Sequence, residues 1–247
     1  MGASAERAAT GRRILLKLSG ELLATGSDAG VTGEGLAQAA AQIAGARRAG
    51  CEVAVVCGAG NIFRGSGPLG EKLPRCDADA VGMAATLVNA LALEAALRET
   101  GLAARVFSAF DAPRLARLHN PRDCRACLGE GEVVILAGGT GNPYFTTDTA
   151  AALRALELEC TLLIKGTKVD GVYDADPVRE PQAQRFERLT YEEVLARRLG
   201  VMDLTAVTLC MENQLPIVVL DATQPGSVEA FLRQGRGATL IAPAPTD

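Results

Sequence analysis

The sequence predicts a three-layer α/β/α sandwich with a mainly parallel central sheet. Short apolar runs of four to six residues alternate with longer helical stretches along most of the 247 residues. Runs that are apolar at every position are typical of parallel strands buried on both faces, and right-handed crossovers between such strands place helices on both sides of one sheet. The length is roughly 1.6 times that of a typical domain, and no long linker interrupts it, so a single large domain is expected.

The strands are indicated by their composition and by the turns that end them. The first, 14–18, reads Ile-Leu-Leu-Lys-Leu and stops at Ser19-Gly20, and the second, 52–56, stops at a Gly-Ala-Gly turn. Small turn residues directly after an apolar run mark the end of a buried strand. By the same signals, further strands are expected at 104–107, 133–136, 162–165 and 217–220.

Helices are expected between these strands. The stretch 35–48 is rich in Ala and is closed by Gly50, as a C-terminal capping residue would close it. The stretch 79–100 starts near Asp79 and has Gly101 just past its end. It is apolar on nearly every face, whereas a surface helix shows an apolar stripe of roughly 100°, so we expect it to be buried in the core or, as we favour, against a second subunit. Shorter helices are expected at 148–156, 191–198 and 204–212.

Charge and hydropathy limit the possible partners. Residues 1–11 are expected to be a disordered arm and residues 12–247 a single domain. The net charge of −4 excludes the broad basic surface of a non-specific nucleic-acid binder. The longest charge-free stretch, 133–147, falls short of the roughly 18 apolar residues that a membrane-spanning helix needs, and the first ten residues lack the apolar segment of a signal peptide. We therefore expect a cytoplasmic protein without nucleic-acid or membrane partners.

The cysteines and the single histidine indicate no site by themselves. Cys124 and Cys127 form one C-x-x-C pair without a second pair at zinc spacing. His119 is the only histidine available to any Ser-His-Asp or Cys-His pair, and it lies in a loop-like stretch. We expect ordinary thiols in a reducing compartment and no protein metal ligand, and the roles of these three residues stay open.

Four glycine-rich loops follow four of the predicted strands, at 17–20, 58–65, 138–143 and 166–171. In an open parallel sheet, ligands bind outside the carboxyl ends of the strands, and backbone N–H groups in such loops hold phosphates. No G-x-x-x-x-G-K-[ST] is present, and Phe63 stands at the third glycine position of a G-x-G-x-x-G match. The loops therefore predict a phosphate site that is neither a P-loop nor a dinucleotide fingerprint.

Two lysines lie near the ends of predicted strands. Lys17 and Lys165 each stand in a strand of apolar neighbours, where a charge is costly unless it is paired. We expect the partner of both to be a polyphosphate ligand, and Arg64 could hold a phosphate through two hydrogen bonds. For Asp148 two roles stay open: capping of the helix that begins there, or a carboxylate that positions the two lysines.

The motifs around these residues resemble the bacterial uridylate (UMP) kinase family of the amino acid kinase superfamily. The resemblance extends from about Arg12 to Ile241. It rests on Lys17-Leu18-Ser19-Gly20, Gly60-Asn61-x-x-Arg64-Gly65, Thr140-Gly141-Asn142-Pro143-Tyr144-Phe145-Thr146-Thr147-Asp148, Lys168-Val169-Asp170-Gly171-Val172-Tyr173, Val201-Met202-Asp203-Leu204-Thr205 and Gly237-Ala238-Thr239-Leu240-Ile241.

This resemblance implies the amino acid kinase, or carbamate kinase-like, fold and the transfer of the γ-phosphoryl group of ATP to UMP in pyrimidine nucleotide biosynthesis. It implies Mg²⁺ carried with ATP and a homohexamer built as a trimer of dimers. UMP would bind to the part of the domain at roughly 12–160, and ATP to the part at roughly 161–247.

The resemblance also implies site residues by motif position. The catalytic residues would be Lys17, Arg64, Asp148 and Lys165. ATP would be bound by Lys17, Leu18, Ser19, Gly20, Gly60, Arg64, Thr167, Tyr173 and Asp176. UMP would be bound by Ala59, Asp79, Thr140, Gly141, Asn142, Pro143, Tyr144, Phe145, Thr146 and Thr147, with Asp79 accepting hydrogen bonds from the ribose.

Two departures from the family pattern qualify these expectations. Ala59 replaces the middle glycine of G-G-G-N, a position that lines the UMP phosphate, and its methyl group is acceptable there if the local φ is negative. The family is commonly activated by GTP through basic residues, but here Arg98 and Arg105 stand near Glu94 and Glu132. Normal GTP activation is therefore not expected, and other effectors, including UTP as an inhibitor, stay open.

Two other functions stay open as alternatives. One is a non-catalytic binding or storage protein on the same scaffold, similar to the molybdenum storage proteins, which should have lost the cations or the acceptor loop. The other is a kinase for an amino-acid carboxylate, whose site would lack Thr-Gly-Asn-Pro-Tyr-Phe-Thr-Thr-Asp.

Overall fold

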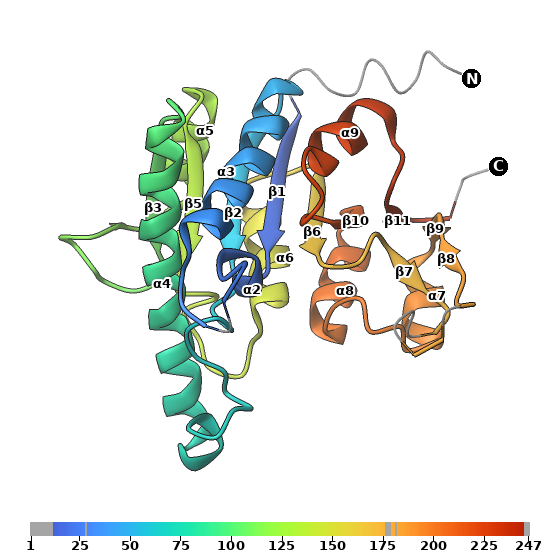
Figure 1. Ribbon diagram of the computed structural model, residues 1–247, viewed down its shortest axis with the longest axis horizontal. Coiled ribbons are helices and arrows are strands. Elements are labelled where there is room, and N and C mark those ends of the chain that lie inside the picture. The colour runs from blue at the N-terminus through green and yellow to red at the C-terminus, as the bar shows by residue number, and fades with distance from the viewer. Residues whose placement is uncertain (1–11, 28, 176–178, 181, 245–247) are drawn as a thin grey trace.

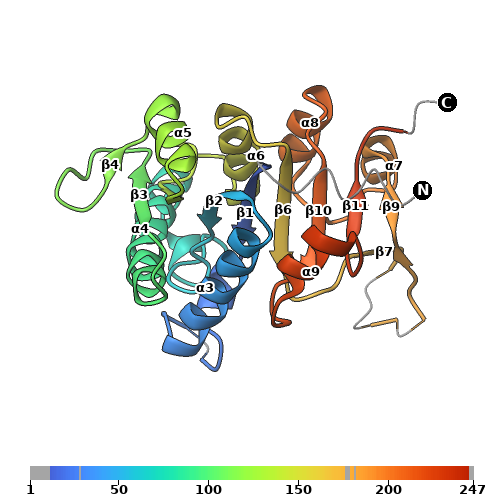
Figure 2. The same cartoon turned by 90° about the horizontal axis from the view of Figure 1, so that it is seen from above.

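The computed structural model describes residues 12–27, 29–175, 179–180 and 182–244, so the expected arm at 1–11 and the candidate residue Asp176 lie outside the described residues. The described chain forms a central sheet with helices on both faces (Figures 1 and 2). The sheet has nine strands in the order β4-β3-β5-β2-β1-β6-β10-β11-β9. Their bounds are β1 Arg13–Leu18, β2 Glu52–Cys57, β3 Ala104–Ser108, β4 Arg117–Leu118, β5 Val133–Ala137, β6 Leu162–Thr167, β9 Arg188–Leu189, β10 Ile217–Asp221 and β11 Thr239–Ile241.

Two helical layers cover the sheet, and each has its own apolar core. Figure 2 shows α3, α4 and α9 on one face and α5, α6, α7 and α8 on the other. The side chains of the central strands alternate between the two cores, so that Ile14 and Leu16 face the first layer and Leu15 the second. The predicted three-layer sandwich is therefore confirmed. The helices are α3 Gly33–Arg48, α4 Arg75–Glu99, α5 Pro121–Gly129, α6 Thr147–Glu157, α7 Tyr191–Ala196, α8 Leu204–Glu212 and α9 Ser227–Gln234.

Within the described residues the sheet is parallel except where β11 runs antiparallel to β10. All six predicted strands are present, with ends that differ by one or two residues. The helix predicted at 204–212 has the predicted bounds, whereas α4 begins four residues before Asp79, directly after Pro74. Pro74 is the N-cap residue, and its ψ of 143° is not helical, so the helix begins at Arg75.

The long helix α4 is buried along one side only. Leu93 and Leu97 are fully buried on the sheet, whereas Val81 and Val88 are 42% and 53% exposed. The expectation of burial on every face is therefore not met within one chain. By length and composition α4 could cross a membrane, with a mean hydropathy of 1.7 over 18 residues, but core helices of soluble proteins meet the same criterion.

Several short elements were not predicted. The hairpin of β7 (Val172–Tyr173) and β8 (Arg185–Phe186) stands apart from the main sheet, and a short helix α2 (Gly20–Leu23) and a 3-10 helix (Gly70–Lys72) flank the loops. Strands of two residues show no hydrophobic period from which they could be predicted. The helices α5 and α9 were also missed, although Asn120 followed by Pro121 is a readable start signal for α5.

Candidate active site

The four glycine-rich loops meet at one edge of the sheet. They follow β1, β2, β5 and β6, which lie side by side in the order β5-β2-β1-β6. These strands are parallel, so their carboxyl ends and the loops after them share one edge. In the register of β1 and β6, Lys17 lies directly opposite Lys165. The topology thus brings together residues that are 148 positions apart in the chain.

Asp148 lies between the two lysines. Its carboxylate oxygens are 2.9 Å from the Nζ of Lys17 and 2.8 Å from the Nζ of Lys165. All three side chains are at most 17% exposed. The hydroxyl of Thr146, not Asp148, caps the start of α6, so the capping role considered for Asp148 is wrong and the positioning role agrees with the structure. The lysines are paired with a carboxylate of their own chain, where a polyphosphate partner was expected.

The charged groups of this cluster shift one another's pKa values. Burial alone would raise the pKa of Asp148, but the two neighbouring ammonium groups hold it below its ordinary value, so the carboxylate is ionised at neutral pH. Burial lowers the pKa of Lys165, and the charge of Lys17 adds to that effect while Asp148 opposes it. Two ammonium groups thus share the carboxylate of Asp148, and the carboxylate of Asp203, which lines the same hollow, also raises the pKa of Lys165.

Asp203 is a site residue that the sequence analysis missed. Its carboxylate caps α8 by accepting the N–H of Ala206 at 2.9 Å, and it also accepts hydrogen bonds from the hydroxyls of Thr146 and Thr149. It thereby ties the start of α8 to the start of α6, beside the lysine pair. An Asp directly before a helical stretch is a capping signal that could have located it.

A cavity of about 260 Å³ lies on the α4 side of the lysine pair. Asp79 of α4 lines it and accepts hydrogen bonds from Arg75 Nε and from the N–H of Tyr144, both at 2.7 Å. Burial would raise the pKa of Asp79, but these bonds keep it below its ordinary value. The predicted UMP-binding residues that line this cavity are Ala59, Asp79, Thr140, Asn142, Phe145, Thr146 and Thr147.

Three predicted UMP-binding residues lie outside that lining. Gly141 and Pro143 belong to the loop behind it, and Tyr144 is 65% exposed, with the guanidinium of Arg75 5.4 Å from its ring centre. Tyr144 adopts a φ of 71° and presents its N–H to Asp79. Its contribution to the cavity therefore comes through the backbone.

Ala59 is accommodated without strain. It is 7% exposed, and it does not belong to the described non-glycine residues that have a positive φ. The condition stated for its methyl group, a negative φ, is therefore met. Gly20, by contrast, must be glycine, because a Cβ there would lie 2.6 Å from the carbonyl oxygen of Gly58.

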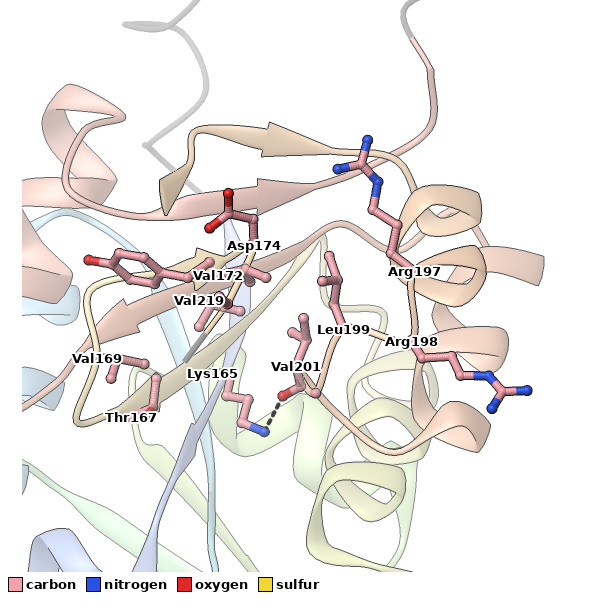
Figure 3. A pocket seen from close by; sticks show the side chains of 14 residues that line it. Lys165, Thr167, Val169, Val172, Asp174, Arg197, Arg198, Leu199, Val201 and Val219 are labelled. Atoms are coloured by element: carbon pink, nitrogen blue, oxygen red, sulfur yellow. Dashed lines mark hydrogen bonds between the residues drawn. The ribbon is translucent and has the colours of Figure 1, made fainter. Parts of the chain in front are cut away.

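A larger cavity of about 590 Å³ lies on the other side, between β6 and the loop before α8 (Figure 3). Lys165, Thr167 and Tyr173, all predicted for the ATP side, line it. The sequence analysis did not predict the loop that closes the opposite wall, where Arg197, Leu199 and Val201 lie. The Nζ of Lys165 donates a hydrogen bond to the carbonyl oxygen of Val201.

A third hollow joins the two cavities. It is lined by Lys17, Asp148 and Lys165, and it shares Lys165 with the larger cavity and Thr146 and Thr147 with the smaller one. The lysine pair therefore lies where the two cavities meet. This arrangement can hold two anionic ligands end to end with their charged groups at the lysines.

The sequence signature of the amino acid kinase family matches residues 12–221. The chain belongs to the amino acid kinase family. Among its relatives, the uridylate kinases of Magnetococcus marinus and Azorhizobium caulinodans are each 48% identical to it over 233 and 232 residues, which are 94% of this chain and 97% of each relative.

Solved structures agree with this membership. The UMP kinase of Ureaplasma parvum superposes with a TM-score of 0.88 at 35% identity and covers 94% of this chain and 98% of its own. The UMP kinase of Bacillus anthracis gives a TM-score of 0.89 at 32% identity, with 94% and 96% covered. The predicted family and fold are therefore confirmed.

In this amino acid kinase, one carboxylate connects the loops of the two cavities. Glu21 forms ion pairs with Arg64 of the loop after β2 and, at 2.9 Å, with Lys168 of the loop after β6. The hydrogen bond from Lys168 and the charge of Arg64 lower the pKa of Glu21. Arg64 is 57% exposed and does not belong to the lining of the three cavities described above, although it was predicted to be catalytic. Three other residues were predicted to bind ATP. Ser19 caps α2, Leu18 is fully buried, and Gly60 lines the smaller cavity and not the larger one.

The two arginines considered for an effector are each paired within the chain. Arg105 donates two hydrogen bonds to Glu132, at 2.7 and 2.5 Å, and Arg98 lies 3.3 Å from Glu94. Arg114 and Arg117 line the same hollow as Arg105 and Glu94, so the effector stays an open question.

The histidine and the C-x-x-C pair lie on the far side of α6. His119 Nδ1 is 3.5 Å from Cys124 Sγ, and His119 Nε2 is 2.8 Å from Glu157. Burial raises the pKa of Cys124 to about 12, so its thiol is protonated. Within the described ranges, no three His, Cys, Asp or Glu side chains are grouped so that they could hold a metal ion.

Proposed function

We propose that this protein is a uridylate kinase that transfers the γ-phosphoryl group of ATP to UMP and forms UDP and ADP. The observation that carries the proposal is the lysine pair at the junction of two cavities, with Asp148 between them. Phosphoryl transfer between two anions requires positioning and charge neutralisation more than covalent chemistry by the protein. The relatives that are named uridylate kinases support the choice of substrates.

The two cavities fit the two substrates by size and chemistry. We propose that ATP occupies the larger cavity at β6 and UMP the smaller one at α4. The ionised carboxylate of Asp79 would accept hydrogen bonds from ribose hydroxyls. Both phosphate ends would then meet at Lys17 and Lys165, which would stabilise the charge on the transferring group.

No side chain needs to remove a proton. The attacking oxygen of the UMP phosphate is already ionised at neutral pH, and Asp148 is held by two ammonium groups at 2.9 and 2.8 Å. The role of Asp148 in the proposal is to position the lysines and to keep Lys165 charged against the effect of its burial.

We propose Mg²⁺ as the cofactor, carried on the phosphates of ATP. Mg²⁺ commonly keeps several waters and binds through substrate phosphates with few protein ligands, and the carboxylate nearest the phosphate position, Asp148, is occupied by lysines. When bound, the ion would neutralise charge at the β- and γ-phosphates. The chain's own residues would then supply orientation and the two ammonium groups of Lys17 and Lys165.

We further propose a cytoplasmic enzyme of pyrimidine nucleotide biosynthesis that assembles as a hexamer of three dimers. The apolar side chains that α4 leaves exposed, Val81 and Val88, lie two turns apart on one face of the helix, and this supports a contact between subunits. The alternatives are a storage protein and a carboxylate kinase. The described site retains the cations and the acceptor loop, which favours the nucleotide kinase over both.

A coupled assay of ADP release with UMP, CMP, AMP and dTMP tests the proposal. We expect turnover with UMP at a kcat/KM well above that of the others; an equal value for any of them, or phosphorylation of aspartate, glutamate or acetylglutamate instead, would contradict the assignment. Lys17→Ala should lower kcat at least about 10²-fold, the scale of one lost charge-stabilising group. An unchanged rate would remove Lys17 from the mechanism.

A further inference from the structure

The turn after β5 forms one wall of the smaller cavity and has an unusual backbone. Gly138 and Gly139 have φ values of 80° and 59°, in the left-handed region that favours glycine. The hydroxyl of Thr86 on α4 accepts the N–H of Gly138 at 2.7 Å. Gly139 and Thr140 line the cavity. The backbone conformation of Gly138 and Gly139 therefore shapes this wall of the smaller cavity.

Arg154 contacts the same turn through a hydrogen bond. It lies on α6, its side chain is 7% exposed, and its Nη2 donates a hydrogen bond to the carbonyl oxygen of Gly139 at 3.1 Å. Its Nη1 is 2.7 Å from Glu157 one turn further along the helix. A buried guanidinium must be both paired and hydrogen-bonded, and here the backbone of the turn supplies one of its partners.

Glu157 is itself held in place by His119. His119 Nε2 lies 2.8 Å from the same carboxylate oxygen that Arg154 contacts, and the His119 side chain is 8% exposed. Burial would raise the pKa of Glu157, but the hydrogen bonds from His119 and Arg154 lower it, so the carboxylate stays ionised. The ion pair therefore leaves Arg154 little freedom to move away from the turn.

The hydrogen bond from Arg154 to the Gly139 carbonyl also sets the direction of the Thr140 N–H. In a trans peptide the C=O and the following N–H point in opposite directions. Because Arg154 draws the Gly139 carbonyl toward α6, the N–H of Thr140 faces away from α6. This N–H makes no hydrogen bond within the described part of the chain, so it is available to an acceptor atom of a ligand in the cavity.

We propose that Arg154 is a positioning residue for the acceptor site: by fixing the Gly139–Thr140 peptide it presents the Thr140 N–H to a carbonyl oxygen of the bound nucleobase. Arg154 itself does not line the cavity, and it acts through the turn. The substrate assignment within this proposal rests on the proposed uridylate kinase function. The larger cavity does not include the turn, so ATP binding is independent of Arg154.

The test compares Arg154→Met and Arg154→Lys with a matched control. Arg13→Met removes a similar arginine at the opposite edge of the sheet, 18% exposed, which pairs with Glu52 at 2.7 Å and donates to the carbonyl oxygen of Leu158 at 2.7 Å. We expect Arg154→Met to raise KM and Kd for UMP about tenfold or more, the effect of losing a charged hydrogen bond. KM for ATP should stay within about twofold, and Arg13→Met should change neither constant.

Arg154→Lys keeps the charge but cannot hold Gly139 and Glu157 together, so its KM for UMP should lie between those of the wild type and Arg154→Met; it carries the comparison if the Met variant does not fold. Equal increases for UMP and ATP, or an Arg154→Met that behaves like Arg13→Met, would overturn the proposal.

Hydrogen exchange of the Gly138 and Gly141 amides, which are bonded to the Thr86 hydroxyl and to the Gly138 carbonyl, gives a readout that needs no activity. It should be about tenfold faster in Arg154→Met than in the wild type and unchanged in Arg13→Met, because the freed turn opens more often. Unchanged exchange in Arg154→Met would also overturn the proposal. If the wild type fails to phosphorylate UMP, the proposed function is wrong, and the exchange experiment alone decides whether Arg154 positions the turn.

Discussion

Asp148→Asn should show how strongly the lysine pair depends on one carboxylate. Asn keeps the shape of the side chain but removes the charge that lies 2.9 Å from Lys17 and 2.8 Å from Lys165. All three groups are at least 83% buried, so solvent screens the ion pairs little. Removing one partner of a buried ion pair costs about 3–5 kcal/mol. We expect the variant to lose about 3 kcal/mol of unfolding free energy at neutral pH, the lower end of that range.

Urea unfolding of both proteins measures this difference, and Asp123→Asn is the control. Asp123 is an exposed acidic residue in the first turn of α5, as Asp148 is an acidic residue in the first turn of α6. It therefore reports the helix-dipole contribution, which is about 0.3–1 kcal/mol, without the lysines. If Asp148→Asn loses no more than Asp123→Asn, the carboxylate is not what stabilises the buried lysines, and the reasoning fails.

The stability that Asp148 contributes should be lost at acid pH. The pKa of Asp148 is lower in the folded chain than its ordinary value of 3.8. Its stabilising contribution is therefore fully present above about pH 3.8 and is lost as the pH falls through the folded pKa. The gap in stability between the wild type and Asp148→Asn should be the same near neutral pH and near pH 5, and it should narrow only below about 3.8. A gap that already closes between pH 7 and 5 would assign the effect to another group.

Two further predictions concern the mouth of the smaller cavity. Asp79→Asn should raise KM for UMP about tenfold and leave KM for ATP unchanged in steady-state kinetics, because the ionised carboxylate that lines only this cavity is lost; equal effects on both substrates would contradict its assignment to UMP. Cys76 is the exposed cysteine among seven, and the other six are buried, so a thiol reagent should label one cysteine rapidly in the native protein and none in Cys76→Ser. Rapid labelling that survives Cys76→Ser would show that a buried thiol, such as Cys124 with its pKa near 12, becomes accessible.

The sequence alone located the six longer strands, five of the helices and the loops that carry the chemistry. Buried parallel strands are apolar along their whole length, and so the runs at 14–18, 133–136 and 162–165 could be predicted without the structure. Lys17 and Lys165 stood out because a charge in such a run needs a partner. The resemblance of the motifs to uridylate kinases identified the family, which the comparisons confirmed.

Short elements and the far walls of the cavities could not be predicted in this way. The two-residue strands β7 and β8 show no hydrophobic period. Arg197 and Leu199 come together with Lys165 and Thr167 around the larger cavity only in the folded chain. Asp203 reads in sequence as an ordinary helix cap. Its contact with Thr149, 54 positions away, exists only in the folded chain.

Only the tertiary structure shows that Lys17 and Lys165 both pair with Asp148. In sequence, Asp148 was either a cap or a positioning carboxylate, and the lysines appeared to need a phosphate. The register of β1 with β6 sets Lys17 opposite Lys165, and the start of α6 brings Asp148 between them. Composition and local pattern determine which side chains are buried, because burial follows hydrophobic periodicity over a few residues. Which charges meet depends on strand order and register, and distant segments of the chain set these together.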